Sequence, residues 1–143
     1  MNKIKILQSQ IRTAMEVWGE IKESPHPADQ WLGKYFHKHR KRYGSRDRRF
    51  IAETIYACFR HKAYLEAWVH GVEREEDLNE HTVLFALARE QFIAAKEFSM
   101  HFTTPEEGAW YEKLADGEMP PGFSPKDKAA EWAIRYSYPE WLL

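Results

Sequence analysis

Apolar residues recur every three or four positions along nearly the whole chain, and no stretch alternates apolar and polar residues for long enough to predict a strand. The first such pattern steps through Ile4, Leu7, Ile11, Ala14, Trp18 and Ile21. This spacing places the apolar side chains on one face of a helix, which must then pack against a partner. The periodicity therefore predicts an all-α protein, a compact bundle of about six to eight helices.

The composition fits one globular domain spanning residues 1–143. Hydrophobic residues make up 43% and aromatic residues 15% of the chain, which is enough for a buried core. The longest apolar runs fall short of the roughly 18–20 residues that a membrane span needs, and the N-terminal residues do not resemble a secretory signal. The single cysteine, Cys58, has no second cysteine for an internal disulfide. These features predict a cytoplasmic protein with no membrane partner.

Helix starts are predicted near residues 3, 27, 45, 61, 83, 104 and 124, where proline, capping residues or the apolar spacing mark them. The second helix should end at Tyr43 and Gly44, with the glycine providing the positive φ of a helix C-terminus. Ser45 is the predicted N-cap of the third helix, with Asp47 in its first turn. Residues 50–59 of that helix are apolar nearly all round, which predicts a place at the centre of the bundle. The acidic stretch 73–80 is predicted to be a solvated connector.

The net charge of −1 conceals a basic segment. Between Lys34 and Lys62 there are ten Lys or Arg residues and two acids, so that segment carries +8 and the rest of the chain −9. A concentrated positive surface on an acidic body is typical of proteins that neutralise phosphates. The candidate RNA-binding residues are Lys38, Arg40, Lys41, Arg42, Arg46, Arg48, Arg49 and Arg60.

Residues 46–49, Arg-Asp-Arg-Arg, are the sharpest part of this prediction. Guanidinium groups and unpaired backbone N–H groups at the first turn of a helix suit a phosphate. Asp47 should organise the turn rather than contact a ligand. The alternative is that Arg49 and Arg60 form buried ion pairs that fix the bundle, and Arg49 lies four residues before Glu53, which favours a local pair.

The residues offer no catalytic or metal site in this chain. The glycines are too far apart for a nucleotide-binding loop, and Cys58 lies mid-helix among apolar residues, where an inert buried thiol is expected. His37 and His39 are two positions apart and point to different sides of a helix. The pair of helices between residues 27 and 59 could be a DNA-binding helix-turn-helix, but the second helix is polar only in its first turn. That pattern favours recognition of the backbone or shape of a structured RNA over reading of DNA bases.

Several segments resemble one known family, the N-terminal region of the Sun/Nop-type RNA cytosine-C5 methyltransferases. They are Ala28-Asp29-Gln30-Trp31-Leu32, Tyr35-Phe36, residues 44–56 (GSRDRRFIAETIY), Arg60-His61 and residues 137–142 (SYPEWL). The resemblance implies an all-helical RNA-binding fold similar to the NusB-like antitermination domains. In the family, a segment like the last one leads into the methyltransferase domain.

The resemblance further implies a full-length protein that methylates a cytosine of ribosomal RNA, with S-adenosylmethionine as cofactor and a cysteine nucleophile. The glycine-rich cofactor motifs and the Pro-Cys and Thr-Cys motifs are not in this chain. We therefore expect an N-terminal RNA-binding domain, truncated before its methyltransferase domain, with RNA and that domain as partners. The alternatives are a stand-alone NusB-like antitermination factor and a protein-interaction module.

Overall fold

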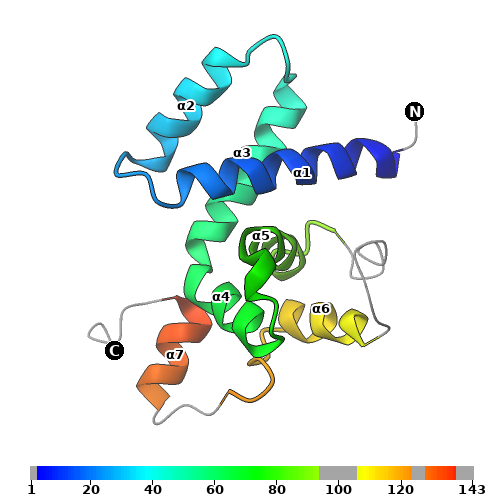
Figure 1. The fold of residues 1–143 in the computed structure, drawn as a ribbon, viewed down its shortest axis with the longest axis vertical. Helices are drawn as coiled ribbons and strands as arrows, with labels where there is room; N and C mark the ends of the chain where they lie inside the picture. The colour runs from blue at the N-terminus through cyan, green and yellow to red at the C-terminus, as the bar shows by residue number, and fades with distance from the viewer. Residues whose placement is uncertain (1–2, 94–105, 124–127, 138–143) are drawn as a thin grey trace.

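A computed structural model describes residues 3–93, 106–123 and 128–137, with the side chains of residues 3–7, 128–130 and 132 left undescribed. The described ranges contain seven α-helices and one short 3-10 helix and no strand, so the all-α prediction is confirmed. The elements, labelled in Figure 1, are α1 (Lys3–Ile21), α2 (Ala28–Lys38), α3 (Ser45–Arg60), α4 (Lys62–Gly71), η1 (Glu75–Asp77), α5 (Leu78–Arg89), α6 (Glu107–Ala115) and α7 (Lys128–Tyr136).

Helix α5 is the centre of the bundle. It packs against α1, α3, α4 and α6, and every residue from Thr82 to Ala88 is buried. The prediction that residues 50–59 of α3 would hold this place is wrong, because Tyr56 and Phe59 on α3 are 38% and 36% exposed. Helix α3 packs on neighbours along one side, whereas α5 is enclosed all round. An apolar character on all faces is expected of such an enclosed helix.

Helix α1 crosses α3 and α5 with its predicted apolar face inward. Ala14, Val17, Trp18 and Ile21 are at most 1% exposed, and the ring of Trp18 meets the edge of Phe59 at a centroid distance of 4.8 Å. The helix ends at Ile21, whereas the sequence predicts an end near Glu23, before Ser24 and Pro25. The side chains of Ile4 and Leu7, which belong to the same sequence pattern, lie outside the described part.

The connection between α2 and α3 differs from its prediction. Helix α2 ends at Lys38, and a turn closed by a hydrogen bond from the Arg42 N–H to the His39 carbonyl, 2.8 Å long, leads to α3. Gly44 has a φ of −76° and is itself the N-cap, so the predictions of a positive φ at Gly44 and of a Ser45 cap are both wrong. The turn reverses the chain before Gly44, which is then free to be extended.

The second half of the fold gathers around α4. Trp68 Nε1 donates a 3.0 Å hydrogen bond to the Glu118 carbonyl, and this ties the segment after α6 to α4. The connector at 73–80 is not all solvated loop, because it forms η1 and the start of α5. The fifth helix accordingly begins at Leu78 rather than Val83, and it ends before Phe92, which is 42% exposed.

Some predictions fall outside the described residues. These are the helix starts at Thr104-Pro105 and Ser124-Pro125 and the segment 138–143. Within the described ranges, α6 begins at Glu107 and α7 at Lys128. A search of the described helices for one long and apolar enough to span a membrane found none.

Candidate nucleic-acid interface

Seven of the eight predicted RNA-binding residues flank the reversal between α2 and α3. We call this set the basic corner: Lys38, Arg40, Lys41, Arg42, Arg46, Arg48 and Arg49. All are exposed except Arg48, which is half-buried. The corner combines the last residue of α2, the turn and the first turn of α3, so a short stretch of chain concentrates seven positive charges on one part of the surface.

A buried tyrosine anchors the corner. Tyr43 is 9% exposed, and its hydroxyl lies 3.2 Å from that of Tyr35 on α2. Burial, with the hydrogen bond to Tyr43 as the next cause, raises the pKa of Tyr35, so its phenol stays protonated at neutral pH. The guanidinium carbon of Arg42 lies 5.4 Å from the centre of the Tyr43 ring, within range of a cation–π contact. The aromatic contacts therefore fix the backbone from which the basic side chains project.

The first turn of α3 is held on both sides. The Nη1 of Arg48 donates to the carbonyl of Tyr43 at 3.4 Å, and Gln10 Nε2 on α1 donates to Asp47 Oδ1 at 2.6 Å. Asp47 also lies where the helix dipole favours a carboxylate. Its carboxylate is thus engaged in positioning α3 on α1, which is the kind of role that the sequence predicts for it.

Arg49 forms the predicted local ion pair. Its Nε lies 3.0 Å from Glu53 Oε1, and the two side chains are 81% and 49% exposed. The pair is therefore not the buried one that the alternative interpretation required. An exposed i,i+4 pair contributes a few tenths of a kcal/mol, about 0.3–0.5, so a phosphate can compete for Arg49 at low cost.

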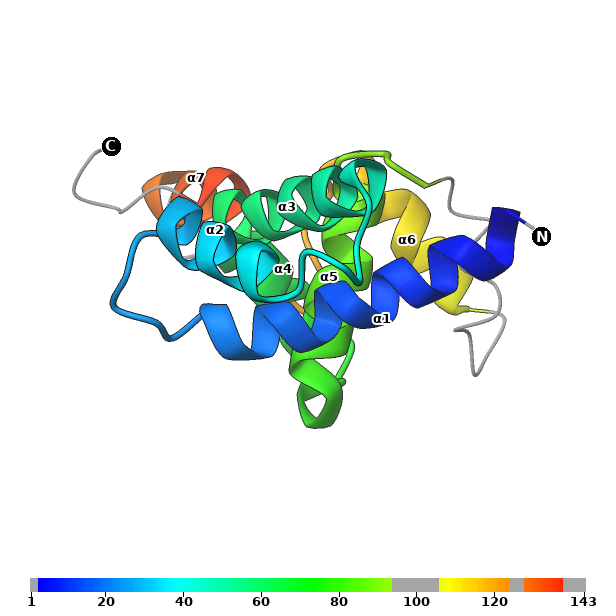
Figure 2. The same cartoon turned by 90° about the horizontal axis from the view of Figure 1, so that it is seen from above.

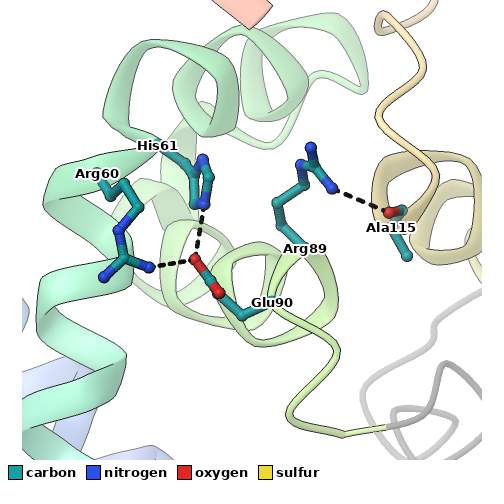
Figure 3. Close-up of polar contacts among 5 residues, drawn as sticks. All are labelled: Arg60, His61, Arg89, Glu90 and Ala115. Atoms are coloured by element: carbon teal, nitrogen blue, oxygen red, sulfur yellow. Dashed lines mark hydrogen bonds and ion pairs between the residues drawn. The ribbon is translucent and has the colours of Figure 1, made fainter. Parts of the chain in front are cut away.

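Arg60 lies apart from the basic corner. It ends α3, fourteen positions after Arg46, and a rise of 1.5 Å per residue separates the two by about 21 Å. Its Nη1 lies 2.5 Å from Glu90 Oε1, and Figure 3 shows His61 reaching the same oxygen from the other side, at 2.7 Å. The Arg60 side chain is 57% exposed, so this ion pair is half-open rather than buried.

The cluster around Glu90 is a structural joint. Burial lowers the pKa of His61 and outweighs the hydrogen bond to Glu90, which raises it. Burial alone would raise the pKa of Glu90, but hydrogen bonds from His61 and Arg60 outweigh it and lower that pKa. At neutral pH a neutral His61 can therefore donate a hydrogen bond from its Nε2–H group to the ionised carboxylate of Glu90. Arg89 Nη1 donates to the Ala115 carbonyl at 3.1 Å, so the joint links α3, α4, α5 and α6 (Figure 3).

Cys58, His37 and His39 do not form a common site. Cys58 is fully buried, as predicted, and burial raises the pKa of its thiol, which disfavours the reactive thiolate. His37 is exposed, while the ring of His39 packs against Tyr35 at a centroid distance of 4.5 Å. A search of the described residues found no group of three or more His, Cys, Asp or Glu side chains able to hold a metal ion.

Sequence reasoning missed a cavity beside the basic corner. It has a volume of about 1180 Å³ and is lined by residues of α1 and α2 and the start of α5. The apolar spacing of the second helix predicts that Trp31 and Tyr35 lie on its buried side, but both are only half-buried and line this cavity. The available signal was the i,i+4 spacing of these two rings beside Lys34 and Lys38.

Comparisons with known proteins leave the family open. No protein-family model, no curated protein and no solved structure matches the chain. The resemblance to the RNA cytosine-C5 methyltransferases therefore stays a prediction from the segments quoted above.

Proposed function

We propose that this domain binds structured RNA by its phosphate backbone through the basic corner. The observation that carries the proposal is the arrangement of Lys38, Arg40, Lys41, Arg42, Arg46 and Arg49 as exposed side chains around one anchored turn. The two acids nearest to them in sequence, Asp47 and Glu53, are engaged by Gln10 and Arg49. A concentrated positive surface of this kind releases counterions when phosphates bind, and this release drives association.

The form of α3 favours backbone contacts over base reading. A recognition helix presents several polar side chains along one exposed face. The exposed positions of α3 beyond its first turn include Glu53, Tyr56 and Phe59, and a carboxylate there repels phosphates that flank a groove. Apart from Arg60, which pairs with Glu90 at the far end, the positive charge of α3 lies near its N-terminus, where guanidinium groups and the helix N-terminus attract the same anion.

The resemblance in sequence supports assigning this activity to a larger protein. We propose that the domain holds RNA, ribosomal in the family, for the catalytic domain of an RNA cytosine-C5 methyltransferase. That domain would bind S-adenosylmethionine and provide the nucleophilic cysteine, and no residue of this chain is assigned to methyl transfer.

Salt dependence of RNA affinity tests the proposal directly. The variant Arg40→Gln/Arg46→Gln removes two exposed charges of the basic corner, and each lost phosphate contact should reduce the log–log salt slope by about 0.7–0.9. The matched control Lys62→Gln/Lys113→Gln removes two exposed charges from α4 and α6 and should leave both affinity and slope unchanged. Equal effects of the two variants on a folded RNA hairpin would contradict the assignment of the basic corner.

A further inference from the structure

The cavity between α1 and α2 has a shape and a lining that suit a ligand. At about 1180 Å³ it exceeds the roughly 300–1,000 Å³ of common small-molecule pockets. Figure 2 shows α2 lying above α1, joined to it by the loop at one end. Helix α2 contributes Trp31, Lys34, Tyr35 and Lys38, and α1 contributes Met15, Glu16, Gly19 and Glu20.

Stacked aromatic rings form the α2 side of this groove. The rings of Trp31 and Tyr35 have centroids 5.3 Å apart and are 13° from parallel. Tyr35 stacks in turn near Tyr43, with centroids 6.2 Å apart and an angle of 22°. The column thus runs from the buried anchor of the basic corner to Trp31 in the groove. A flat aromatic ligand can extend such a column, and nucleobases stack on tryptophan irrespective of sequence.

The positive and negative side chains of the groove come from different helices. Lys34 and Lys38 lie on α2, whereas Glu16 and Glu20 lie on α1 and Glu80 lies at the start of α5, which packs against α1. Carboxylates repel phosphate but accept hydrogen bonds from the amino and imino groups of a base edge. A nucleotide in the groove would therefore keep its phosphate on the α2 side and direct its base toward α1.

The groove is continuous with the basic corner. Lys38 and His39 line it, and they also line a second hollow whose other residues include Arg40, Lys41 and Arg42. An RNA strand whose phosphates lie on the basic corner therefore reaches the groove without crossing an intervening surface. Because the groove opens next to the positive charges of the basic corner, the occupant that fits it best is part of an RNA strand whose phosphates are bound there.

We propose that the groove between α1 and α2 binds unpaired nucleobases of RNA, which stack on Trp31 while the flanking phosphates contact the basic corner. This inference rests on the proposed function and adds to it a preference for RNA with single-stranded nucleotides next to a folded element. Trp31 supplies the stacking surface, and Tyr35 holds its ring in place.

The test compares two RNA hairpins with equal numbers of phosphates, one carrying an unpaired 3′ extension and one fully paired. Trp31→Leu should weaken binding of the extended hairpin by about 5- to 150-fold, the equivalent of one stacked base, and leave the paired hairpin unchanged. Trp31→Phe should retain most of the affinity because it keeps a ring. Trp110→Leu, which removes another half-buried tryptophan, on α6, is the matched control and should change neither affinity.

A second measurement reads the contact itself. RNA carrying 4-thiouridine in the extension should crosslink on irradiation to the tryptic peptide 23–34, in which Trp31 is the sole Trp, Tyr or Phe. Crosslinks confined to other peptides, or an equal loss of both hairpins in Trp31→Leu, would overturn the inference. Binding of both hairpins with equal affinity by the unaltered protein would overturn it while leaving the proposed function intact. Binding of neither hairpin would overturn both.

Discussion

The guanidinium of Arg74 lies 3.0 Å from the carboxylate of Glu107, whose side chain is 3% exposed. The same guanidinium lies over the ring of Trp110, 5.3 Å from its centre. The pair joins the connector after α4 to the first residue of α6, two segments that are far apart in sequence. Because this carboxylate is buried and pairs with a half-buried arginine, the docking of α6 should be sensitive to that arginine.

Replacement of Arg74 by Met should therefore destabilise the fold substantially. Met keeps an unbranched stem against Trp110 but removes the guanidinium that lies 3.0 Å from the Glu107 carboxylate, and loss of one member of a buried pair costs up to about 3–5 kcal/mol. Urea unfolding near neutral pH measures the change. The control is Lys62→Met, which breaks an exposed pair with Glu66 and should cost less than about 0.5 kcal/mol. Similar losses in the two variants would refute the importance of burial here.

His61 should make the fold less stable at mildly acidic pH. Because burial holds the pKa of His61 below its usual value of 6.5, the unfolded chain takes up a proton before the folded chain does. The free energy of unfolding should therefore fall as the pH drops below about 6.5. The lowered pKa of Glu90 acts in the same direction below about 4.5.

The variant His61→Gln isolates this effect, because its amide can donate to Glu90 without titrating. Its unfolding free energy, measured with urea between about pH 7 and pH 5, should vary less with pH than that of the unaltered protein. His37→Gln, at an exposed position of α2, should reproduce the unaltered curve. Parallel curves for all three proteins would contradict the assignment of the acid sensitivity to His61.

The helical class of the fold could be predicted because it depends on local spacing, but the centre of the bundle could not. Both α3 and α5 are rich in apolar residues, and each packs against four other α-helices of the described part. Which of them is enclosed on all faces depends on how those neighbours are arranged around it, and local spacing does not contain that information. The end of α2 was misplaced for a similar reason. A Tyr-Gly pair is typical of a helix end, yet the burial of Tyr43 against Tyr35 set the turn earlier.

In the candidate site, too, features formed by neighbouring residues could be predicted, whereas features formed by segments far apart in sequence could not. Charge density along the chain located the basic corner, since its residues are neighbours in sequence. It could not exclude Arg60, because only the length of α3 and the position of Glu90 directly after α5 show that this arginine lies elsewhere. The spacing of Trp31 and Tyr35 indicated only that two rings share a face of α2, whereas the groove itself depends on the separation of α1 from α2.

The central position of α5 predicts a large effect of truncation there. Leu87 is fully buried, and Leu87→Ala should lower the unfolding free energy by about 2–5 kcal/mol through lost contacts and the cavity left behind. Tyr56→Ala on α3 removes a larger side chain that is 38% exposed and should cost less. Chemical denaturation measures the free energy of unfolding of both variants. A greater loss of stability in Tyr56→Ala than in Leu87→Ala would contradict the assignment of α5 as the centre of the bundle.

Cys58 should be protected from thiol reagents in the folded protein. The side chain is fully buried, and burial raises the pKa of its thiol, so both access and the thiolate are lacking. Ellman's reagent should modify it only after denaturation. An added cysteine at an exposed position, Ser45→Cys, should react at once and serve as the positive control. Rapid labelling of the unaltered folded protein would show that the core around α3 opens readily.

Two helical glycines should respond in opposite ways to alanine. At Gly33, in the interior of α2, a Cβ would meet no atom within 4 Å, so Gly33→Ala should stabilise the fold by about 0.5–1 kcal/mol through helix propensity. At Gly71, the last residue of α4, a Cβ would lie 2.8 Å from the Cβ of Pro120 and 3.1 Å from the Pro121 carbonyl oxygen. Gly71→Ala should therefore destabilise it by about 1–3 kcal/mol, as overpacking does.

Thermal and urea unfolding of the two alanine variants show whether each substitution raises or lowers the free energy of unfolding. The gain in helix propensity applies to each position, so the difference between the variants reports the close approach of α4 to the segment after α6. That approach also places Glu118 to accept the hydrogen bond from Trp68. If Gly71→Ala stabilised the protein as much as Gly33→Ala, the segment at Pro120 would have to move away from α4 at no cost, and the packing of α4 against it would contribute little to the fold.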